Sequence, residues 1–129
     1  TDKGYYTNSY HVNVREEINV FDKFNFESEF QKKSTGGCIS YAEIPNMTNN
    51  IPAVLTMIQY IYDHISYAEF NTKSDYCHEC GFDGEWECPR CHNTNRDKLT
   101  VIRRTCGYLG ENFWNEGRTK EIKDRVMHI

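Results

Sequence analysis

The chain of 129 residues has room for one small domain with a modest core, and its 15 basic and 19 acidic residues give a net charge of −4. This charge balance argues against nucleic acid as a binding partner, because proteins bind nucleic acid through clustered positive charge. The chain also lacks a block of Lys and Arg residues that would indicate binding to a membrane surface. No run of about 18 apolar residues predicts a membrane span and no signal peptide opens the chain, so a cytoplasmic protein is expected.

The first part of the chain is predicted to alternate strands and helices. It begins with TDKGYY and no methionine, which suggests a processed product or a piece of a longer polypeptide. Apolar residues alternate with polar ones over residues 10–14 and again over residues 39–44, after the Gly36–Gly37 turn, so both segments are expected to be strands. Residues 16–33 carry apolar side chains at partly helical spacing and are expected to be partly helical.

The clearest element is a helix over residues 51–65, with Asn50 as its N-cap and Pro52 in its first turn. Its apolar stripe is expected to be buried as ordinary core: Ile51, Val54, Leu55, Ile58, Ile61, Tyr62 and Ile65. Two strands and a long helix within residues 8–67 are what one piece of an α/β barrel or sheet would contain. Aromatic residues make up 14% of the chain, and a fragment of that kind would expose part of this surface.

Two Cys-x-x-Cys pairs lie within fifteen positions, Cys77 with Cys80 and Cys88 with Cys91. Such turns bring four thiolates together as the ligands of a tetrahedral Zn²⁺ site, and this pattern is favoured over disulfides because nothing indicates an oxidising compartment. Four thiolates leave no open coordination position, so the zinc would be structural and would hold together residues 75–97. The neighbouring His78 and His92 are alternative ligands. A zinc ribbon that binds a partner through an exposed Trp86 and Phe82 is the alternative role.

Residues 98–104 predict a strand that leads to Gly107, and the tail 119–129 places Ile122, Val126 and Ile129 on one helical face. Gly107 lies in RRTCGYLG, where an ordinary turn is one explanation. Glycine also offers an α-carbon that can lose a hydrogen atom and leave a planar radical shared with the flanking amides. Arg103 and Arg104 either anchor this loop through carboxylates or backbone carbonyls, or form a solvated strand end.

The arrangement YCxxCGF, CPxC, RRxxGYLG and FWNEGRTKEIKDRVMH resembles the C-terminal end of anaerobic (class III, glycyl radical) ribonucleoside-triphosphate reductases. The upstream text YYTNSYHV and GGCISYAE is similar to the last part of that family's barrel. The resemblance implies an α+β chain: the C-terminal portion of a glycyl-radical-enzyme α/β barrel with a four-cysteine zinc ribbon and a glycyl radical loop. Residues 1–74 would belong to the barrel, 75–97 to the zinc-binding segment, and 98–129 to the radical loop and a C-terminal helix.

The same resemblance implies an enzyme and its cofactors. Gly107 would store a radical made by an iron–sulfur activase that uses S-adenosylmethionine, and the four cysteines would hold structural Zn²⁺. In the full enzyme, expected to be a homodimer, the radical passes to a cysteine in the missing upstream part. That thiyl radical removes the 3′-hydrogen of a ribonucleoside triphosphate, with formate as the usual reductant. Cys38 and Cys106 are interpreted as small packing residues.

Three functions remain open at this point. The chain is the C-terminal portion of such a reductase, either cut from a longer protein or made from a split gene. Alternatively, it is a stand-alone glycyl radical spare-part subunit, or a zinc-ribbon interaction module without radical chemistry. Replacing Gly107 with alanine separates the last function from the other two.

Overall fold

The structure is a computed structural model that describes residues 3–7, 10–36, 38–105, 109–111 and 114–128. In chain order, its elements are α1 (Val20–Gln31), β1 (Ser40–Ile44), α2 (Ile51–His64), β2 (Ala68–Thr72), β3 (Asp75–Cys77), β4 (Asp83–Gly84), β5 (Leu99–Thr100), β6 (Ile102–Arg104), β7 (Leu109–Glu111) and α3 (Glu116–Lys123). The strands form three small sheets, β1–β2, β4–β3–β5 and β6–β7. Helix and sheet are mixed, as predicted, and within the described ranges no sheet closes into a barrel.

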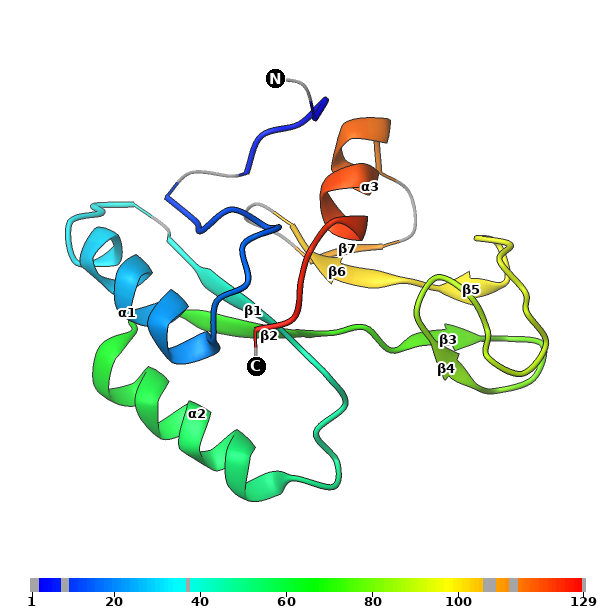
Figure 1. The fold of residues 1–129 in the computed structure, drawn as a ribbon, viewed down its shortest axis with the longest axis horizontal. Coiled ribbons are helices and arrows are strands. Elements are labelled where there is room, and N and C mark those ends of the chain that lie inside the picture. The colour runs from blue at the N-terminus through cyan, green and yellow to red at the C-terminus, as the bar shows by residue number, and fades with distance from the viewer. Residues whose placement is uncertain (1–2, 8–9, 37, 106–108, 112–113, 129) are drawn as a thin grey trace.

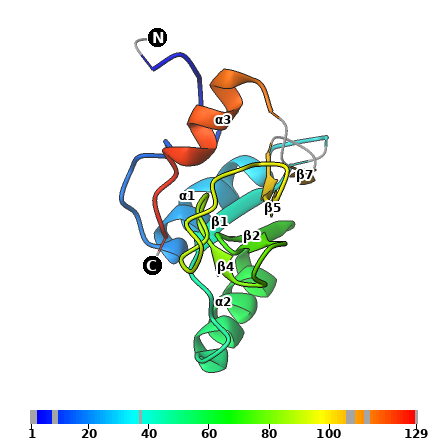
Figure 2. The same cartoon turned by 90° about the vertical axis from the view of Figure 1, so that its right-hand side faces the viewer.

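The centre of the fold is a β–α–β unit in which α2 connects the parallel strands β1 and β2. Ser40 pairs with Ala68 at one end and Ile44 with Thr72 at the other. Parallel neighbours need a long crossover, and a helix of this length supplies it. The predicted strand at residues 39–44 and the predicted helix at residues 51–65 are therefore confirmed. Figure 1 shows α2 beside this sheet, and Figure 2 shows α3 on the opposite side of it.

The prediction that the apolar stripe of α2 is buried was wrong in part. Val54 and Ile61 pack against the core around Met57, but Leu55 is 60% exposed and Tyr62 is 84% exposed. The stripe covers two adjoining helical faces, and only one of them meets the sheet. Asn50 does occupy the N-cap position, although its side chain makes no capping hydrogen bond. None of the helices in the described ranges is long and apolar enough to cross a membrane.

The strand predicted at residues 10–14 does not form. Its backbone groups form hydrogen bonds with separate partners. Val12 N–H donates to Glu27 Oε1 at 3.1 Å, and Val14 C=O accepts from Val126 N–H at 2.9 Å. Because a side chain and the C-terminal tail take these groups, no neighbouring strand pairs with the segment. The helix expected within residues 16–33 is confirmed as α1, and Asn19 caps it by accepting from Asp22 N–H at 3.0 Å.

The C-terminal half also departs from the expected elements. The predicted strand at residues 98–104 is two strands, because the chain changes partners at Val101: β5 pairs with β3, and β6 pairs with β7. The predicted tail helix ends at Lys123 and does not reach Val126. Beyond it the backbone is extended toward β1, where His128 N–H donates to Glu43 C=O at 2.8 Å. Ile129 lies outside the described residues.

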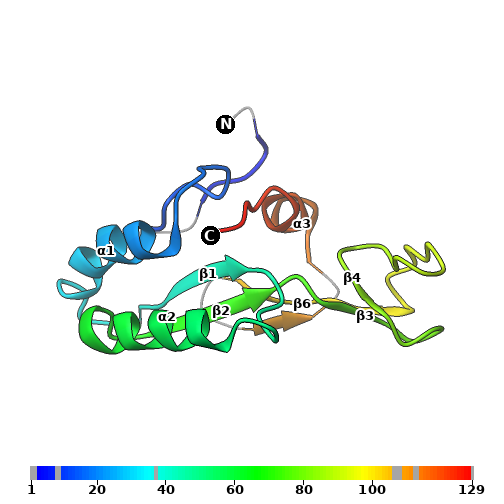
Figure 3. The same cartoon turned by 60° about the horizontal axis from the view of Figure 1, so that its bottom comes forward.

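Two apolar clusters stabilise the two ends of the molecule. The larger one lies between α1, α2 and β1 around Phe24, Ala42 and Ile44. The smaller one contains Leu99 and Val101 together with two of the cysteines. Figures 1 and 3 show the corresponding arrangement, with α1 and α2 at one end and the β4–β3–β5 sheet projecting at the other.

A buried polar layer lies between β1 and the C-terminal tail. Burial, reinforced by the charge of Lys23, lowers the pKa of His128 to about 4. The ring is therefore neutral at pH 7, and its Nδ1 accepts a hydrogen bond from Glu43 N–H at 2.9 Å. Other charged groups around the ring are Glu27, Lys73 and Arg125. Folding thus depends on an uncharged His128.

Acidification is expected to weaken the fold through His128. An unfolded histidine has a pKa of about 6.5, so as the pH falls from about 7 toward 4 the unfolded chain binds a proton that the folded chain excludes. This effect should lower the free energy of unfolding by about 2 kcal/mol between pH 7 and pH 5. Urea unfolding of the wild type and of His128→Asn measures it, since Asn Oδ1 takes the place of Nδ1 but does not titrate. Other titrating groups contribute to both proteins, so equal pH dependence in the two would contradict the assignment.

Candidate metal centre and the strands flanking Gly107

Four thiols converge at the projecting end of the molecule. The Sγ atoms of Cys77, Cys80, Cys88 and Cys91 all lie within 4.8 Å of one another, and no other His, Cys, Asp or Glu side chain of the described residues joins this group. Cys77 and Cys91 are 3.8 Å apart, Cys80 and Cys91 are 3.7 Å apart, and Cys80 and Cys88 are 3.1 Å apart. Tetrahedral zinc with Zn–S bonds of about 2.3 Å separates its sulfurs by about 3.8 Å. The donor set and its spacing fit such an ion.

The alternatives to four thiolates are not supported by this geometry. All four cysteines are free rather than paired in disulfides. His78 Nε2 instead lies 2.6 Å from Thr100 Oγ1, and His92 Nδ1 lies 2.7 Å from Glu87 Oε1. Both imidazoles therefore have partners outside the thiol group. Cys38 is also free and is not part of the cluster.

The two Cys-x-x-Cys segments form the same turn. Cys77 C=O accepts from Gly81 N–H, and Cys88 C=O accepts from His92 N–H, both at 2.9 Å. The residue after each pair lies in the left-handed region, with φ of 70° for Gly81 and 56° for His92. The first knuckle uses glycine for this conformation, whereas the second forces a residue with a Cβ into it.

The thiol cluster is continuous with the apolar cluster beneath it. Cys77 and Cys88 are fully buried beside Leu99 and Val101. The exposed surface predicted around Trp86 and Phe82 is present only at Phe82, which is 46% exposed. Trp86 is half-buried and packs edge-to-face on Trp114, with ring centroids 6.5 Å apart. The cysteine segment is thereby attached to the residues that lead into α3.

The arginines before Gly107 have carboxylate partners, and their interpretation as a solvated strand end is wrong. Arg103 is 1% exposed and donates to Asp75 through Nη1 at 2.5 Å and Nη2 at 3.0 Å. Arg104 Nη1 lies 3.0 Å from Glu69 Oε2. Asp75 was not predicted as a site residue, and it also accepts from Trp86 N–H at 2.8 Å. Its only signal in the sequence was its place two residues before Cys77.

Strands β6 and β7 hold the two ends of the segment that contains Gly107. Arg104 pairs with Leu109, so residues 105–108 connect the strands. Thr105 is fully buried at the end of β6. Gly107, Cys106 and Tyr108 lie outside the described residues.

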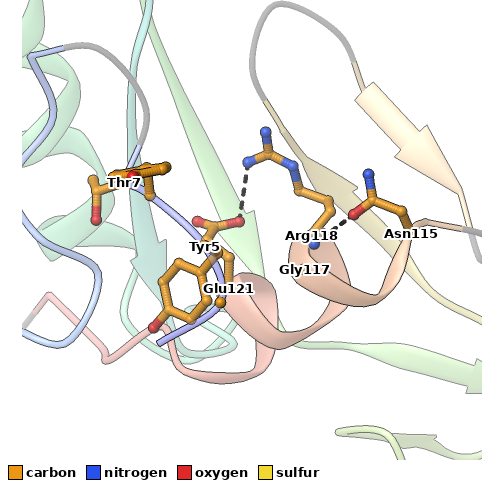
Figure 4. A pocket seen from close by; sticks show the side chains of 8 residues that line it. Tyr5, Thr7, Asn115, Gly117, Arg118 and Glu121 are labelled. Carbon is orange, nitrogen blue, oxygen red and sulfur yellow. Dashed lines mark hydrogen bonds and ion pairs between the residues drawn. The ribbon is translucent and has the colours of Figure 1, made fainter. Parts of the chain in front are cut away.

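A hollow between the N-terminal segment and α3 contains none of the predicted site residues (Figure 4). Asn115 Oδ1 accepts from Arg118 N–H at 2.8 Å, and Arg118 Nη1 points to Glu121 Oε2 at 3.2 Å. A Cβ at Gly117 would lie 3.0 Å from Gly4 O, so a glycine here lets the two segments approach closely. Tyr5 Oη donates to Asp124 Oδ2 at 2.7 Å, which fastens the N-terminal residues to the end of α3.

Comparison with known proteins covers almost the entire chain. A family model described as anaerobic ribonucleoside-triphosphate reductase matches residues 1–128. The chain belongs to this family. It is 44% identical over 139 residues to the anaerobic ribonucleoside-triphosphate reductase of Haemophilus influenzae and 42% identical over 139 residues to that of Escherichia coli, covering 100% of this chain and 20% of each relative.

The relationship extends to a bacteriophage. The anaerobic ribonucleoside-triphosphate reductase of Enterobacteria phage T4 is 42% identical over 138 residues, which is 99% of this chain and 23% of that protein. The chain thus spans about a fifth of the length of these curated reductases. The resemblance inferred from the cysteine pairs and the RRxxGYLG segment is confirmed.

Substituting His92 with glycine is expected to strengthen the second knuckle. Relief of the left-handed conformation should stabilise the thiol cluster by about 1 kcal/mol, or roughly five-fold in affinity for a bound metal. Competition with a chelator measures this affinity. His92→Ala is the matched control, because it also loses the contact with Glu87 but keeps the Cβ. Equal affinities for the glycine and alanine variants would show that backbone strain is not the cause.

Proposed function

We propose that this chain is the glycyl-radical-bearing C-terminal region of an anaerobic ribonucleoside-triphosphate reductase that acts in the cytoplasm. Gly107 stores the radical that starts the reduction of ribonucleotides. The observation that carries this proposal is the structural connection between the four-thiol cluster and the segment of Gly107. Cys77 of the cluster pairs with Leu99 of β5, and β5 is followed by β6, which ends at Arg104. Membership of the reductase family over residues 1–128 supports it.

The cysteines Cys77, Cys80, Cys88 and Cys91 hold structural Zn²⁺ in this proposal. When bound, the metal supplies cross-links between the two knuckles, and four thiolates leave no position for a substrate. Cys77 lies on β3, which pairs with β5, and β5 leads through Val101 into β6. The metal therefore stabilises the strand that precedes Gly107. In the proposal the chain has three parts: residues 1–74 of the barrel, the zinc-binding segment 75–97, and residues 98–129 with the radical loop and the C-terminal helix. The pairing of β3 with β5 joins the second part to the third.

Gly107 would lose one hydrogen atom from its α-carbon to an iron–sulfur activase that uses S-adenosylmethionine. The unpaired electron is shared with the flanking amides. In the complete homodimeric enzyme it is passed to a cysteine upstream of this chain, and the resulting thiyl radical removes the 3′-hydrogen of a ribonucleoside triphosphate. Formate supplies two electrons and becomes carbon dioxide, while the 2′-hydroxyl takes up a proton and leaves as water.

The surface of the chain is consistent with a larger protein. The outer face of α2 exposes Ile51, Leu55, Ile58 and Tyr62. Burying such a face is favourable by about 25 cal/mol per Å² of apolar area. In the proposal, the upstream part of the reductase covers this face and completes the barrel around the β1–α2–β2 unit.

The zinc proposal predicts one zinc ion per chain by elemental analysis. Cys88→Ser should lower zinc affinity at least ten-fold, because it replaces a buried soft ligand by a hydroxyl. Cys38→Ser is the matched control and should retain one equivalent, since Cys38 is outside the cluster. Full zinc retention in Cys88→Ser would contradict the ligand assignment.

The radical proposal predicts a doublet in anaerobic electron paramagnetic resonance of the complete reductase treated with activase and S-adenosylmethionine. Gly107→Ala should abolish the doublet, because the Cβ of alanine crowds the planar radical and leaves no α-hydrogen to split the signal in two. Gly36→Ala is the control and should keep it, since a Cβ at Gly36 meets no atom within 4 Å.

Two outcomes would overturn the radical assignment. A doublet of undiminished intensity in Gly107→Ala would place the radical on another residue. Absence of a signal in zinc-replete wild-type enzyme with all partners would favour the zinc-ribbon interaction module.

A further inference from the structure

The backbone of Arg104, three residues before Gly107, is held on both of its polar atoms. Its N–H donates to Asn71 Oδ1 at 2.8 Å, and its C=O accepts from Arg125 Nη1 at 2.8 Å. Asn71 comes from β2, whereas Arg125 follows α3. Two segments that are distant in the sequence therefore fix one residue of β6, through the peptide groups on both sides of its α-carbon.

The two groups that hold Arg104 are oriented by the same carboxylate oxygen. Glu43 Oε1 accepts from Asn71 Nδ2 and from Arg125 Nη1, both at 2.9 Å. These bonds close a ring that runs from Glu43 through Asn71, Arg104 and Arg125 back to Glu43. The ring also fixes the orientation of the Asn71 amide, because the carboxylate needs a donor and the Arg104 N–H needs an acceptor.

The ring is buried, and its members are held by several bonds each. Glu43 is fully buried, and Asn71 and Arg125 are 4% and 3% exposed. Arg125 is further held by Glu121, through Nε to Oε1 at 3.0 Å and Nη2 to Oε2 at 3.1 Å. Charge-assisted hydrogen bonds of this kind are strong in a buried site, and their geometry is restricted.

The position of the ring gives it a role beyond stability. Arg104 is the last residue of β6, where pairing with Leu109 ends. Three residues span at most about 10 Å, so the position of Arg104 limits where the α-carbon of Gly107 can lie. Transfer of a hydrogen atom requires the reacting atoms to be about 3 to 3.5 Å apart, and an error of about 1 Å can cost about 100-fold in rate.

We propose that Asn71 and Arg125, oriented by Glu43, are positioning residues for Gly107. They fix the peptide from which the Gly107 segment departs, so that its α-carbon is presented to the activase and later to the upstream cysteine. This inference rests on the proposed radical function of Gly107. The side-chain pairs of Arg103 and Arg104 with Asp75 and Glu69 hold the strand, whereas the ring holds the main chain at its end.

The test uses complete, zinc-replete reductase with Asn71→Ala, activated anaerobically with activase and S-adenosylmethionine. The expected result is at least a ten-fold lower radical yield per folded chain, measured by the electron paramagnetic resonance doublet. Val20→Ala is the matched control, because it removes buried apolar contacts of α1 and touches neither β6 nor the ring. It should lower the thermal midpoint without lowering the radical yield.

A second pair of variants separates positioning from folding. Arg125→Lys keeps a charged donor for Glu43 and the Arg104 carbonyl and should restore part of the radical yield that Arg125→Met loses. This comparison decides the question if Asn71→Ala does not fold.

A yield in folded Asn71→Ala within two-fold of the wild type would overturn the positioning role and leave Gly107 as the radical site. Equal yields in the two Arg125 variants would also overturn it. A missing doublet in the wild type would instead overturn the proposed function itself.

Discussion

The burial of Glu43 is the constraint around which the C-terminal half of the chain is organised. A carboxylate taken out of water on β1 needs both a counter-charge and hydrogen-bond donors, or its desolvation would destabilise the fold. Arg125 supplies the charge, and Asn71 supplies a further donor. To reach Glu43, the chain must leave α3 at Lys123 and extend along β1, which brings His128 to the Glu43 backbone. The end of α3, the path of the tail and the placement of β6 thus follow from one buried charge.

The four-cysteine cluster and this polar layer lie at opposite ends of β5 and β6. Cys77 of the cluster lies on β3, which pairs with β5, while Glu43 and its partners hold the end of β6. Between them, Asp75 ties Arg103 to the Trp86 backbone. The region has few apolar residues to bury, so buried ion pairs, together with metal–ligand bonds in the proposed zinc-bound state, supply much of the stability that a larger core would supply. Such interactions are directional, and they specify where a strand ends as well as whether it forms.

The features predictable from the sequence are those that local spacing determines. The four cysteines lie in two short pairs, so their convergence follows from turns within the pairs, and the helix at residues 51–65 follows from its periodicity. Periodicity did not reveal which of two apolar faces of α2 meets the sheet, because both satisfy a helical repeat. The ring around Arg104 was not predicted, since Glu43 and Asn71 are 28 positions apart and Glu43 and Arg125 are 82 positions apart. Residues 10–14 alternate like a strand but give their backbone groups to Glu27 and Val126, which no local pattern reveals.

The outer face of α2 has a practical consequence for handling this region. A helix with Leu55 and Tyr62 mostly in water offers a continuous apolar surface to any neighbour, including another copy of the same chain. Where nothing else covers this face, copies of the region would associate through it at the concentrations used for spectroscopy. Polar substitutions confined to this face, which lies away from the thiols and from β6, would give a dispersed sample in which both can be studied.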